Sequence, residues 1–170
     1  VISKFAMTLD GKIATYSGHS QWITGEEARE NVHELRNEVD AILVGIGTVL
    51  KDNPALTTRL KERTCKNPIR IVLDRELRTP LNAQIVQTDD AKTIVVTAED
   101  QQHKASAFEN LGVALLYVPV IDSKLDLNTM LDELYKRGIT DLLVEGGGEV
   151  NASFLRNGLI QKFLVYVAPK

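Results

Sequence analysis

The run Glu145-Gly146-Gly147-Gly148-Glu149 contains the residue types that point most directly to ligand binding. It follows a short apolar stretch and precedes an amphipathic one, so we expect it to join a strand to a helix. Glycines let the backbone approach a ligand closely, and the first turn of a helix offers unpaired N–H groups to an anion. A ligand-free tight turn is the alternative, but three consecutive glycines carry an entropic cost that such a turn does not require. We therefore interpret the run as a cradle for a dinucleotide pyrophosphate, although it lacks the G-x-G-x-x-G pattern of a standard Rossmann domain.

A second glycine turn, Gly45-Ile46-Gly47-Thr48, also lies between a predicted strand and a predicted helix. Ligands of open α/β sheets gather at the carboxyl edge of the strands, which is where this turn falls. Either turn alone is weak evidence. Two such turns, after two different strands, predict one shared crevice.

Four basic residues are candidates for binding an anionic substrate. Arg29, His33 and Arg36 fall on one helical face by i, i+4, i+7 spacing, and Arg59 lies in a loop that follows Asn53-Pro54. An arginine fork suits a phosphate group. From spacing alone, a solvated helix face and an exposed loop arginine are the better interpretations, so the substrate role needs other support.

Three further residues have both a functional and a structural interpretation. Asp52 is a candidate acid or cofactor-orienting group if it faces the crevice, and a turn-forming aspartate if it does not. Trp22 precedes a helix, where its ring can stack on a cofactor or pack as a hydrophobic staple. Lys4 lies inside the first predicted strand, so it is paired or functional if it points inward.

The elements that must position these residues alternate between strands and helices. Short apolar or β-branched runs predict strands at 2–8, 41–44, 69–73, 93–97, 113–118, 141–144 and 163–167. Helical patterns are expected at 24–38, 48–51, 101–110, 126–138 and 148–157. Thr24 and Glu27 fit a capping box at the start of the first helix. Alternation of this kind predicts an α/β domain with a largely parallel, buried sheet.

Composition excludes several classes of protein. The chain has 170 residues, is 44% apolar and carries a net charge of −3, which fits one globular domain and offers no basic field for nucleic acid. No apolar run approaches the roughly 20 residues of a membrane span. The lone Cys65 fits a reducing cytoplasm, and His19, His33 and His103 match no metal-ligand spacing, so we expect no metal.

Several blocks, in this order, carry a resemblance to a known family. They are Thr8-Leu9-Asp10-Gly11-Lys12-Ile13-Ala14, Ser20-Gln21-Trp22-Ile23-Thr24, Asp40-Ala41-Ile42-Leu43-Val44-Gly45, Gly47-Thr48-Val49-Leu50, Asp52-Asn53-Pro54-Ala55-Leu56-Thr57-Thr58-Arg59, Pro68-Ile69-Arg70-Ile71-Val72-Leu73-Asp74, Glu145-Gly146-Gly147 and Ala168-Pro169-Lys170. With them the chain resembles the reductase domain of the bifunctional riboflavin-biosynthesis deaminase/reductase over nearly its whole length.

That resemblance implies a dihydrofolate-reductase-like three-layer fold, with a mostly parallel central sheet and helices on both faces. It implies a single NADPH-dependent reductase domain over residues 1–170, a cytoplasmic location and a homo-oligomeric state. The family's zinc deaminase domain, with its His-x-Glu and Pro-Cys-x-x-Cys signature, is not in this sequence. We therefore expect a fragment, with that domain upstream and final strands downstream.

The resemblance also assigns residues. It implies substrate contacts at Ser20, Arg36, Leu56, Arg59 and Glu145, with the arginines near a ribose phosphate. It implies NADPH contacts at Ala6, Trp22, Thr48, Asp52, Gly147, Gly148, Glu149, Val150 and Asn151. Arg75, after the third strand, is expected on the adenosine side, where its charge suits a 2′-phosphate.

The implied reaction reduces the ribosylamino group of 5-amino-6-(5-phosphoribosylamino)uracil to a ribityl chain and needs a proton donor. Asp52, Glu145 and Lys4 are the candidates, with Asp52 preferred. Three other functions stay open: reduction of the 2,5-diamino-pyrimidine precursor, reduction of a pterin, and a non-catalytic NADPH-binding module. A pterin has no phosphate to occupy Arg36 and Arg59, which separates it from the first two substrates.

Overall fold

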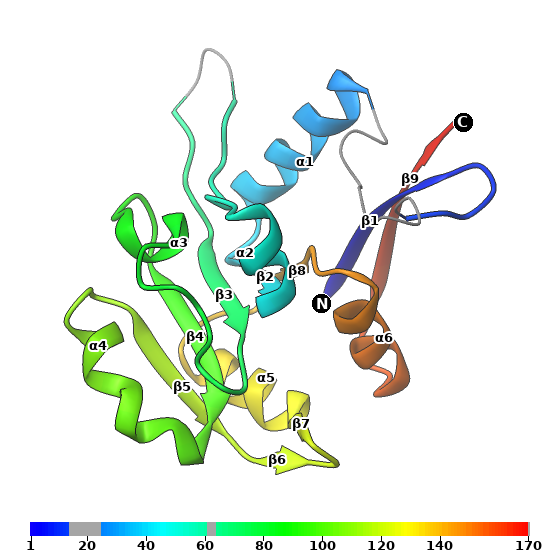
Figure 1. The fold of residues 1–170 in the computed structure, drawn as a ribbon. Coiled ribbons are helices and arrows are strands. Elements are labelled where there is room, and N and C mark those ends of the chain that lie inside the picture. The colour runs from blue at the N-terminus through cyan, green and yellow to red at the C-terminus, as the bar shows by residue number, and fades with distance from the viewer. Residues whose placement is uncertain (14–24, 61–63, 170) are drawn as a thin grey trace.

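The structure is a computed structural model that describes residues 1–13, 25–60 and 64–169. Its centre is a seven-stranded sheet in which every pair of neighbours is parallel, in the order β5-β4-β3-β2-β8-β1-β9 (Figure 1). The strands are β1 (Ile2–Thr8), β2 (Ala41–Gly45), β3 (Ile69–Leu73), β4 (Thr93–Ala98), β5 (Ala114–Val118), β8 (Leu142–Val144) and β9 (Lys162–Ala168). A separate antiparallel hairpin joins β6 (Val120–Ile121) to β7 (Lys124–Leu125).

Helices connect the strands. They are α1 (Glu26–Glu38), α2 (Ile46–Asp52), α3 (Gln84–Gln87), α4 (Ala105–Glu109), α5 (Leu127–Lys136) and α6 (Gly148–Arg156), with a 3₁₀ helix, η1, over Glu99–Lys104. Among the described residues, no helix is both long and apolar enough to cross a bilayer.

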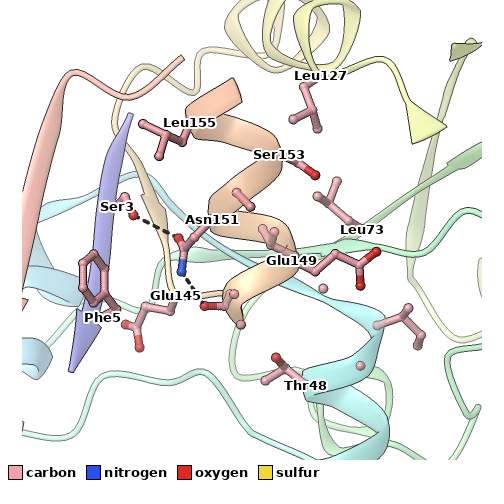
Figure 2. A pocket seen from close by; sticks show the side chains of 18 of the residues that line it. Ser3, Phe5, Thr48, Leu73, Leu127, Glu145, Glu149, Asn151, Ser153 and Leu155 are labelled. Atoms are coloured by element: carbon pink, nitrogen blue, oxygen red, sulfur yellow. Dashed lines mark hydrogen bonds between the residues drawn. The ribbon is translucent and has the colours of Figure 1, made fainter. Parts of the chain in front are cut away.

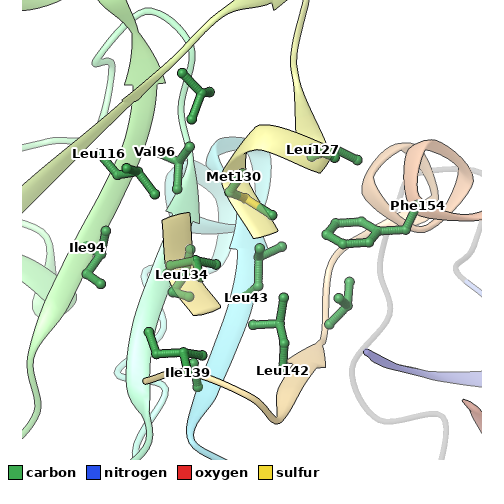
Figure 3. Packing of buried hydrophobic residues seen from close by; sticks show 14 residues of the cluster. Leu43, Ile94, Val96, Leu116, Leu127, Met130, Leu134, Ile139, Leu142 and Phe154 are labelled. Atoms are coloured by element: carbon green, nitrogen blue, oxygen red, sulfur yellow. The ribbon is translucent and has the colours of Figure 1, made fainter. Parts of the chain in front are cut away.

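The first hydrophobic layer lies between the sheet and helices α5 and α6. Met130 and Leu134 of α5 and Phe154 of α6 are at most 1% exposed, and they pack on strand residues that include Leu43 and Val144 (Figure 3). Successive side chains of a strand point to opposite faces. The neighbours of Leu43 in β2 must therefore serve the other face.

The second hydrophobic layer confirms this alternation. Ile42 and Val44 of β2 pack with Val49 of α2, Ile85 of α3 and Phe108 of α4. With a helical layer on each side of a parallel sheet, the predicted three-layer α/β fold is confirmed.

The predicted strands agree with the structure to within one residue at each end, while some helix details were wrong. α1 begins at Glu26 with Gly25 as its N-cap and no side-chain cap bond, one residue later than a cap at Thr24 implies; Thr24 itself lies outside the described residues. The helix expected at 101–110 is instead η1 followed by α4. The short α3 and the β6–β7 hairpin were missed, since four-residue and two-residue elements are too short to show a period.

Candidate active site

A cleft of about 1150 Å³ opens where β8 stops. β8 pairs with β1 only at Ile2–Leu143 and Ser3–Val144, so β1 continues past it without a neighbour on that side. Lys4, Phe5 and Ala6 of β1 form one wall of the cleft, and the turns after β2 and β8 form the rest. The short strand therefore creates the cavity by ending early in the middle of the sheet.

The two glycine turns lie side by side in this cleft, as predicted. Val150 of α6 packs between them so closely that a Cβ at Gly45 would lie 2.7 Å from it and one at Gly146 would lie 2.6 Å away. These two glycines are thus required by packing inside the protein. Gly147 differs, because a Cβ there would meet nothing within 4 Å. Of the glycines predicted to cradle a ligand, Gly146 is therefore explained by packing, and the space for a ligand lies at Gly147.

The N-terminus of α6 is fixed to the sheet by one amide side chain. Asn151 donates to the Gly146 carbonyl at 2.8 Å and accepts from the Ser3 hydroxyl at 2.9 Å (Figure 2). Ser3 is fully buried on β1, and the sequence analysis did not single it out. Asn151, expected as a cofactor contact, has its side-chain amide engaged in orienting the helix.

Glu145 is the centre of a buried ion-pair network. Its backbone N–H donates to the Leu43 carbonyl at 2.9 Å, which extends the sheet ladder by one residue. Its carboxylate accepts from Arg36 through Nε at 2.9 Å and Nη2 at 3.0 Å, and Lys4 Nζ lies 2.9 Å from Oε2. The side chain of Glu145 is only 8% exposed.

These contacts decide the protonation state of Glu145. Burial alone would raise the pKa of the carboxyl, but Arg36 and Lys4 outweigh it and lower the pKa to about 2. A carboxylate that is bonded to both Arg36 and Lys4 cannot take up and release a proton without losing those ion pairs. Glu145 therefore acts as a fixed negative charge that aims Lys4 and Arg36, and the candidate proton donors reduce to Lys4 and Asp52.

Arg36 has less freedom to bind a phosphate than the sequence analysis supposed. Besides its two bonds to Glu145, its Nη1 donates to the Thr57 carbonyl at 3.1 Å. The loop that carries Arg59 is thereby tied to α1. Arg59 itself is exposed, and its backbone N–H donates to His33 Nδ1 at 3.2 Å. Of the two arginines, Arg59 is the one whose side chain is presented to solvent.

The other predicted residues divide into three groups. The residues that line the cleft are Lys4, Ala6, Thr48, Asp52, Arg75, Glu145, Gly147, Gly148, Glu149, Val150 and Asn151. Leu56 is not brought to the cleft, because it is 5% exposed and packs in the second hydrophobic layer. Ser20 and Trp22, assigned to substrate and cofactor, lie outside the described residues.

The sequence analysis missed a set of basic residues in the cleft lining. Lys51 at the end of α2, Arg78 after β3 and Lys124 at the tip of the β6–β7 hairpin join Arg75 there. The hairpin tip turns through two non-glycine residues with positive φ, Asp122 and Ser123. Three separate segments, the end of α2, the stretch after β3 and the β6–β7 hairpin, supply this charge, so no local motif signals it.

The architecture and this site agree with one known family. The family described as the RibD C-terminal domain matches residues 1–170. The chain belongs to this family. Among curated members, the riboflavin biosynthesis protein RibD of Actinobacillus pleuropneumoniae is 45% identical over 171 residues, covering 100% of the chain and 45% of that protein.

Two further relatives extend the comparison within the RibD C-terminal domain family. A 2,5-diamino-6-ribosylamino-4(3H)-pyrimidinone 5′-phosphate reductase of Methanothermobacter thermautotrophicus is 42% identical, over 99% of the chain and 77% of that protein. The crystal structure of a diaminohydroxyphosphoribosylaminopyrimidine deaminase/5-amino-6-(5-phosphoribosylamino)uracil reductase from Thermotoga maritima superposes with a TM-score of 0.80 at 38% identity. The match covers 99% of the present chain and 44% of the Thermotoga chain. The chain thus spans less than half the length of the RibD relatives that it matches.

Proposed function

We propose that the chain is an NADPH-dependent reductase that converts 5-amino-6-(5-phosphoribosylamino)uracil to its 5-phosphoribitylamino product. The observation that carries the proposal is the position of the Glu145 network. It lies between the open glycine end of α6 on one side and the exposed Arg59 loop on the other. The cavity contains the dinucleotide cradle, and the Arg59 loop, which is outside its lining, is joined to the network through Arg36. This arrangement suits a redox cofactor in the cavity and a sugar phosphate that reaches Arg59. The Thermotoga relative is named for the same reaction, which supports the proposal.

The residues present fit a dinucleotide. Gly147 and Gly148 leave backbone N–H groups of the first turn of α6 open to a pyrophosphate. The cleft is slightly larger than the ~300–1,000 Å³ of typical small-molecule pockets, which suits an elongated cofactor together with a second ligand. Thr48 and Ala6 lie on its walls, and the positive charges of Arg75, Arg78 and Lys124 suit the extra phosphate of NADPH.

The protein's own part in the reaction follows from the network. The nicotinamide would supply the hydride for C1′ of the ribosyl group. Arg59 binds the substrate phosphate at a distance from C1′, so that binding energy orients the reacting end. Glu145 holds the Lys4 ammonium in the cleft, where its positive charge stabilises negative charge that develops on the ring-opening oxygen.

Asp52 is the first candidate for proton delivery because it lines the cleft without belonging to the Glu145 network. Asp52→Asn keeps the size of the side chain but removes its exchangeable acid proton. We expect kcat to fall about 100-fold with KM nearly unchanged, which is the low end of general acid catalysis. Steady-state kinetics with NADPH test this expectation. Turnover near the wild-type rate would transfer the proton-donor role to Lys4.

A second substrate has specific support. The Methanothermobacter relative is named for reduction of the 2,5-diamino-pyrimidine, and the chain covers 77% of that protein at 42% identity. Both substrates carry the same ribose phosphate, so Arg59 does not distinguish them. They differ at the pyrimidine 2-position, where one has an amino group and the other an oxygen.

A spectrophotometric assay decides between these reactions. Loss of NADPH absorbance would be followed with the ribosylamino-uracil phosphate, its diamino precursor and dihydrofolate as separate substrates. We expect oxidation with the first and none with dihydrofolate, which has no phosphate for Arg59. A higher kcat/KM with the diamino compound would reassign the substrate, and NADPH binding without any oxidation would leave only a binding module.

The cellular location and the oligomeric state belong to the same proposal. The single cysteine suits a reducing cytoplasm. Association with a second copy follows from the family resemblance. Phe163, Val165 and Val167 of β9 are 39–50% exposed, and this apolar row is available either to a second copy or to the strands expected downstream.

A further inference from the structure

Side chains from outside the Arg59 loop hold its backbone at three successive residues. The Thr57 carbonyl accepts from Arg36, the Thr58 N–H donates to Asn67 Oδ1 at 2.8 Å, and the Arg59 N–H donates to His33 Nδ1. Arg36 and His33 are both on α1, one turn apart. Arginine and asparagine keep their hydrogen-bonding character at all ordinary pH values, whereas histidine does not. Of these three hydrogen bonds, only the one between the Arg59 N–H and His33 is therefore sensitive to pH.

The hydrogen bond fixes the tautomer of His33. Nδ1 receives an N–H and so must carry a lone pair, which places the proton of the neutral ring on Nε2. A second proton would have to enter at Nδ1, where it would face the Arg59 N–H. Protonation of His33 and this hydrogen bond therefore exclude each other.

The charges around His33 favour the neutral ring. Arg36 on the same helix, Arg59 on the loop and Lys4 on β1 face it with positive charge, and Glu145 after β8 faces it with negative charge. Burial first, and then Arg36 and Arg59, lower the pKa of His33 below its ordinary value, while Glu145 opposes them. The hydrogen bond to Arg59 is then intact at neutral pH.

We propose that His33 is a positioning residue whose neutral ring fixes the Arg59 backbone, so that acidification releases the loop and weakens binding of the substrate's phosphate. The proposal rests on the proposed function in one respect, which is the assignment of Arg59 to that phosphate. Because the bonded state holds fewer protons than the released state, its full stability is present above the ordinary histidine pKa. It is lost as the pH falls from there toward the lowered value.

Two substitutions at His33 separate the hydrogen bond from the ring. In His33→Asn, the side-chain oxygen occupies the position of Nδ1 and accepts at every pH, whereas His33→Gln carries its polar end farther out. We expect KM for the phosphorylated substrate in the wild type to rise roughly fivefold as the pH falls from about 8 to about 5, which corresponds to one net hydrogen bond. His33→Asn should keep the low KM and show only the pH dependence that comes from the substrate phosphate itself, whose second pKa is about 6. His33→Gln should have the raised KM throughout, with kcat less affected.

His103→Asn is the matched control, because His103 lies on η1 outside the cleft lining and its ring nitrogen contacts the Asp100 carbonyl on the same helix. Its pH profile should follow that of the wild type. A His33→Asn profile identical to wild type would overturn the proposal. So would phosphate affinity that rises on acidification, since His33 would then act as an added positive charge and not as a hydrogen-bond acceptor.

A measurement on the full chain that needs no activity keeps this test apart from the proposed function. Nitrogen-15 NMR reports which ring nitrogen of His33 is protonated and whether the Arg59 amide shift follows the His33 titration. We expect an unprotonated Nδ1 at neutral pH and a common midpoint for the two signals. A proton on Nδ1, or an Arg59 amide that does not respond, would overturn the proposal even in an active enzyme. The expected signals in a chain without reductase activity would instead refute only the proposed function.

Discussion

Glu145→Gln is expected to produce the largest loss of both stability and activity among single substitutions in the cleft. The glutamine keeps the shape of the side chain but leaves Lys4 and Arg36, which are 16% and 12% exposed, without a counter-charge. Removal of one partner from a buried ion pair costs about 3–5 kcal/mol, because the remaining charge is still desolvated. Turnover should fall together with stability, since the carboxylate that positions Lys4 and Arg36 is lost, and Arg36 in turn holds the loop that carries Arg59.

The pH dependence of unfolding gives an independent check on Glu145. Its pKa in the folded chain is lowered to about 2, so its ionised form contributes stability above the ordinary glutamate pKa. That contribution, roughly 3 kcal/mol for a shift of this size, is lost as the pH falls toward 2. Denaturant titrations over this pH range should show a larger loss for the wild type than for Glu145→Gln, which keeps only the contributions of other carboxyls such as Asp40 and Asp126.

Glu133→Gln is the control for these measurements. Glu133 pairs with Lys136 at 2.6 Å on the surface of α5, where the lysine is 68% exposed. Solvent screens such a pair, so its removal should change the free energy of unfolding little. If Glu145→Gln changed the free energy of unfolding as little as Glu133→Gln, the Glu145 network would not stabilise the fold.

Gly146→Ala is expected to have the second largest effect, through packing. The new Cβ would lie 2.6 Å from Val150 Cβ, so α6 must move away from the turn. Overpacking of this kind costs about 1–3 kcal/mol. The displacement would also tilt the first turn of α6, so NADPH affinity should fall as well. Thermal unfolding and fluorescence titration with NADPH measure the two effects.

Gly147→Ala distinguishes packing from ligand approach. Its Cβ meets nothing within 4 Å, and the residue has φ −67, which any amino acid adopts. Stability should therefore be unchanged while NADPH affinity falls, because the methyl group enters the space left for the ligand. Unchanged affinity would contradict the placement of the pyrophosphate at this turn.

The double variant Gly146→Ala/Val150→Ala tests the cause of the first effect. Truncation of Val150 to alanine removes two of the three atoms that the new methyl group would meet, Cγ1 at 2.7 Å and Cγ2 at 3.1 Å, and leaves Cβ at 2.6 Å. The second substitution should therefore relieve part of the cost of the first, so the two should be non-additive. If their costs simply added, strain at Gly146 would come from some other contact.

The strands and the edge where ligands gather could be predicted from sequence because they depend on local pattern. The runs 2–8 and 69–73 agree with β1 and β3 at both ends. At the start of the run expected to be helical from 126 to 138, Asp126 caps α5 by accepting from the Asn128 N–H at 3.1 Å, and Gly138 ends that region with φ +80. Each of these depends on a side chain and neighbours within a few positions.

The roles inside the cleft could not be predicted in this way. Arg36 and Glu145 are 109 residues apart, and nothing near either residue indicates that they pair. The sequence therefore suggested that Arg36 binds a phosphate and that Glu145 donates a proton. In the structure, most of the N–H donors of the Arg36 guanidinium are used inside the protein, and the same contact keeps the Glu145 carboxyl ionised. The contact of Gly146 with Val150 was hidden for a related reason, since a glycine needed for packing and one needed for a ligand look alike in sequence.

The pairing of β1 has a consequence for how the chain reaches its fold. β1 lies between β8 and β9, so both of its strand partners lie more than 130 residues further along the sequence. Among the strands of this sheet, β1 is therefore made first but pairs only after β2 to β5 have formed a sheet of their own. Parallel pairing at such separations is slow, and an unpaired strand is prone to aggregate. We expect refolding to show an early phase from β2–β5 and a late one that forms the cleft, so catalytic competence is acquired last.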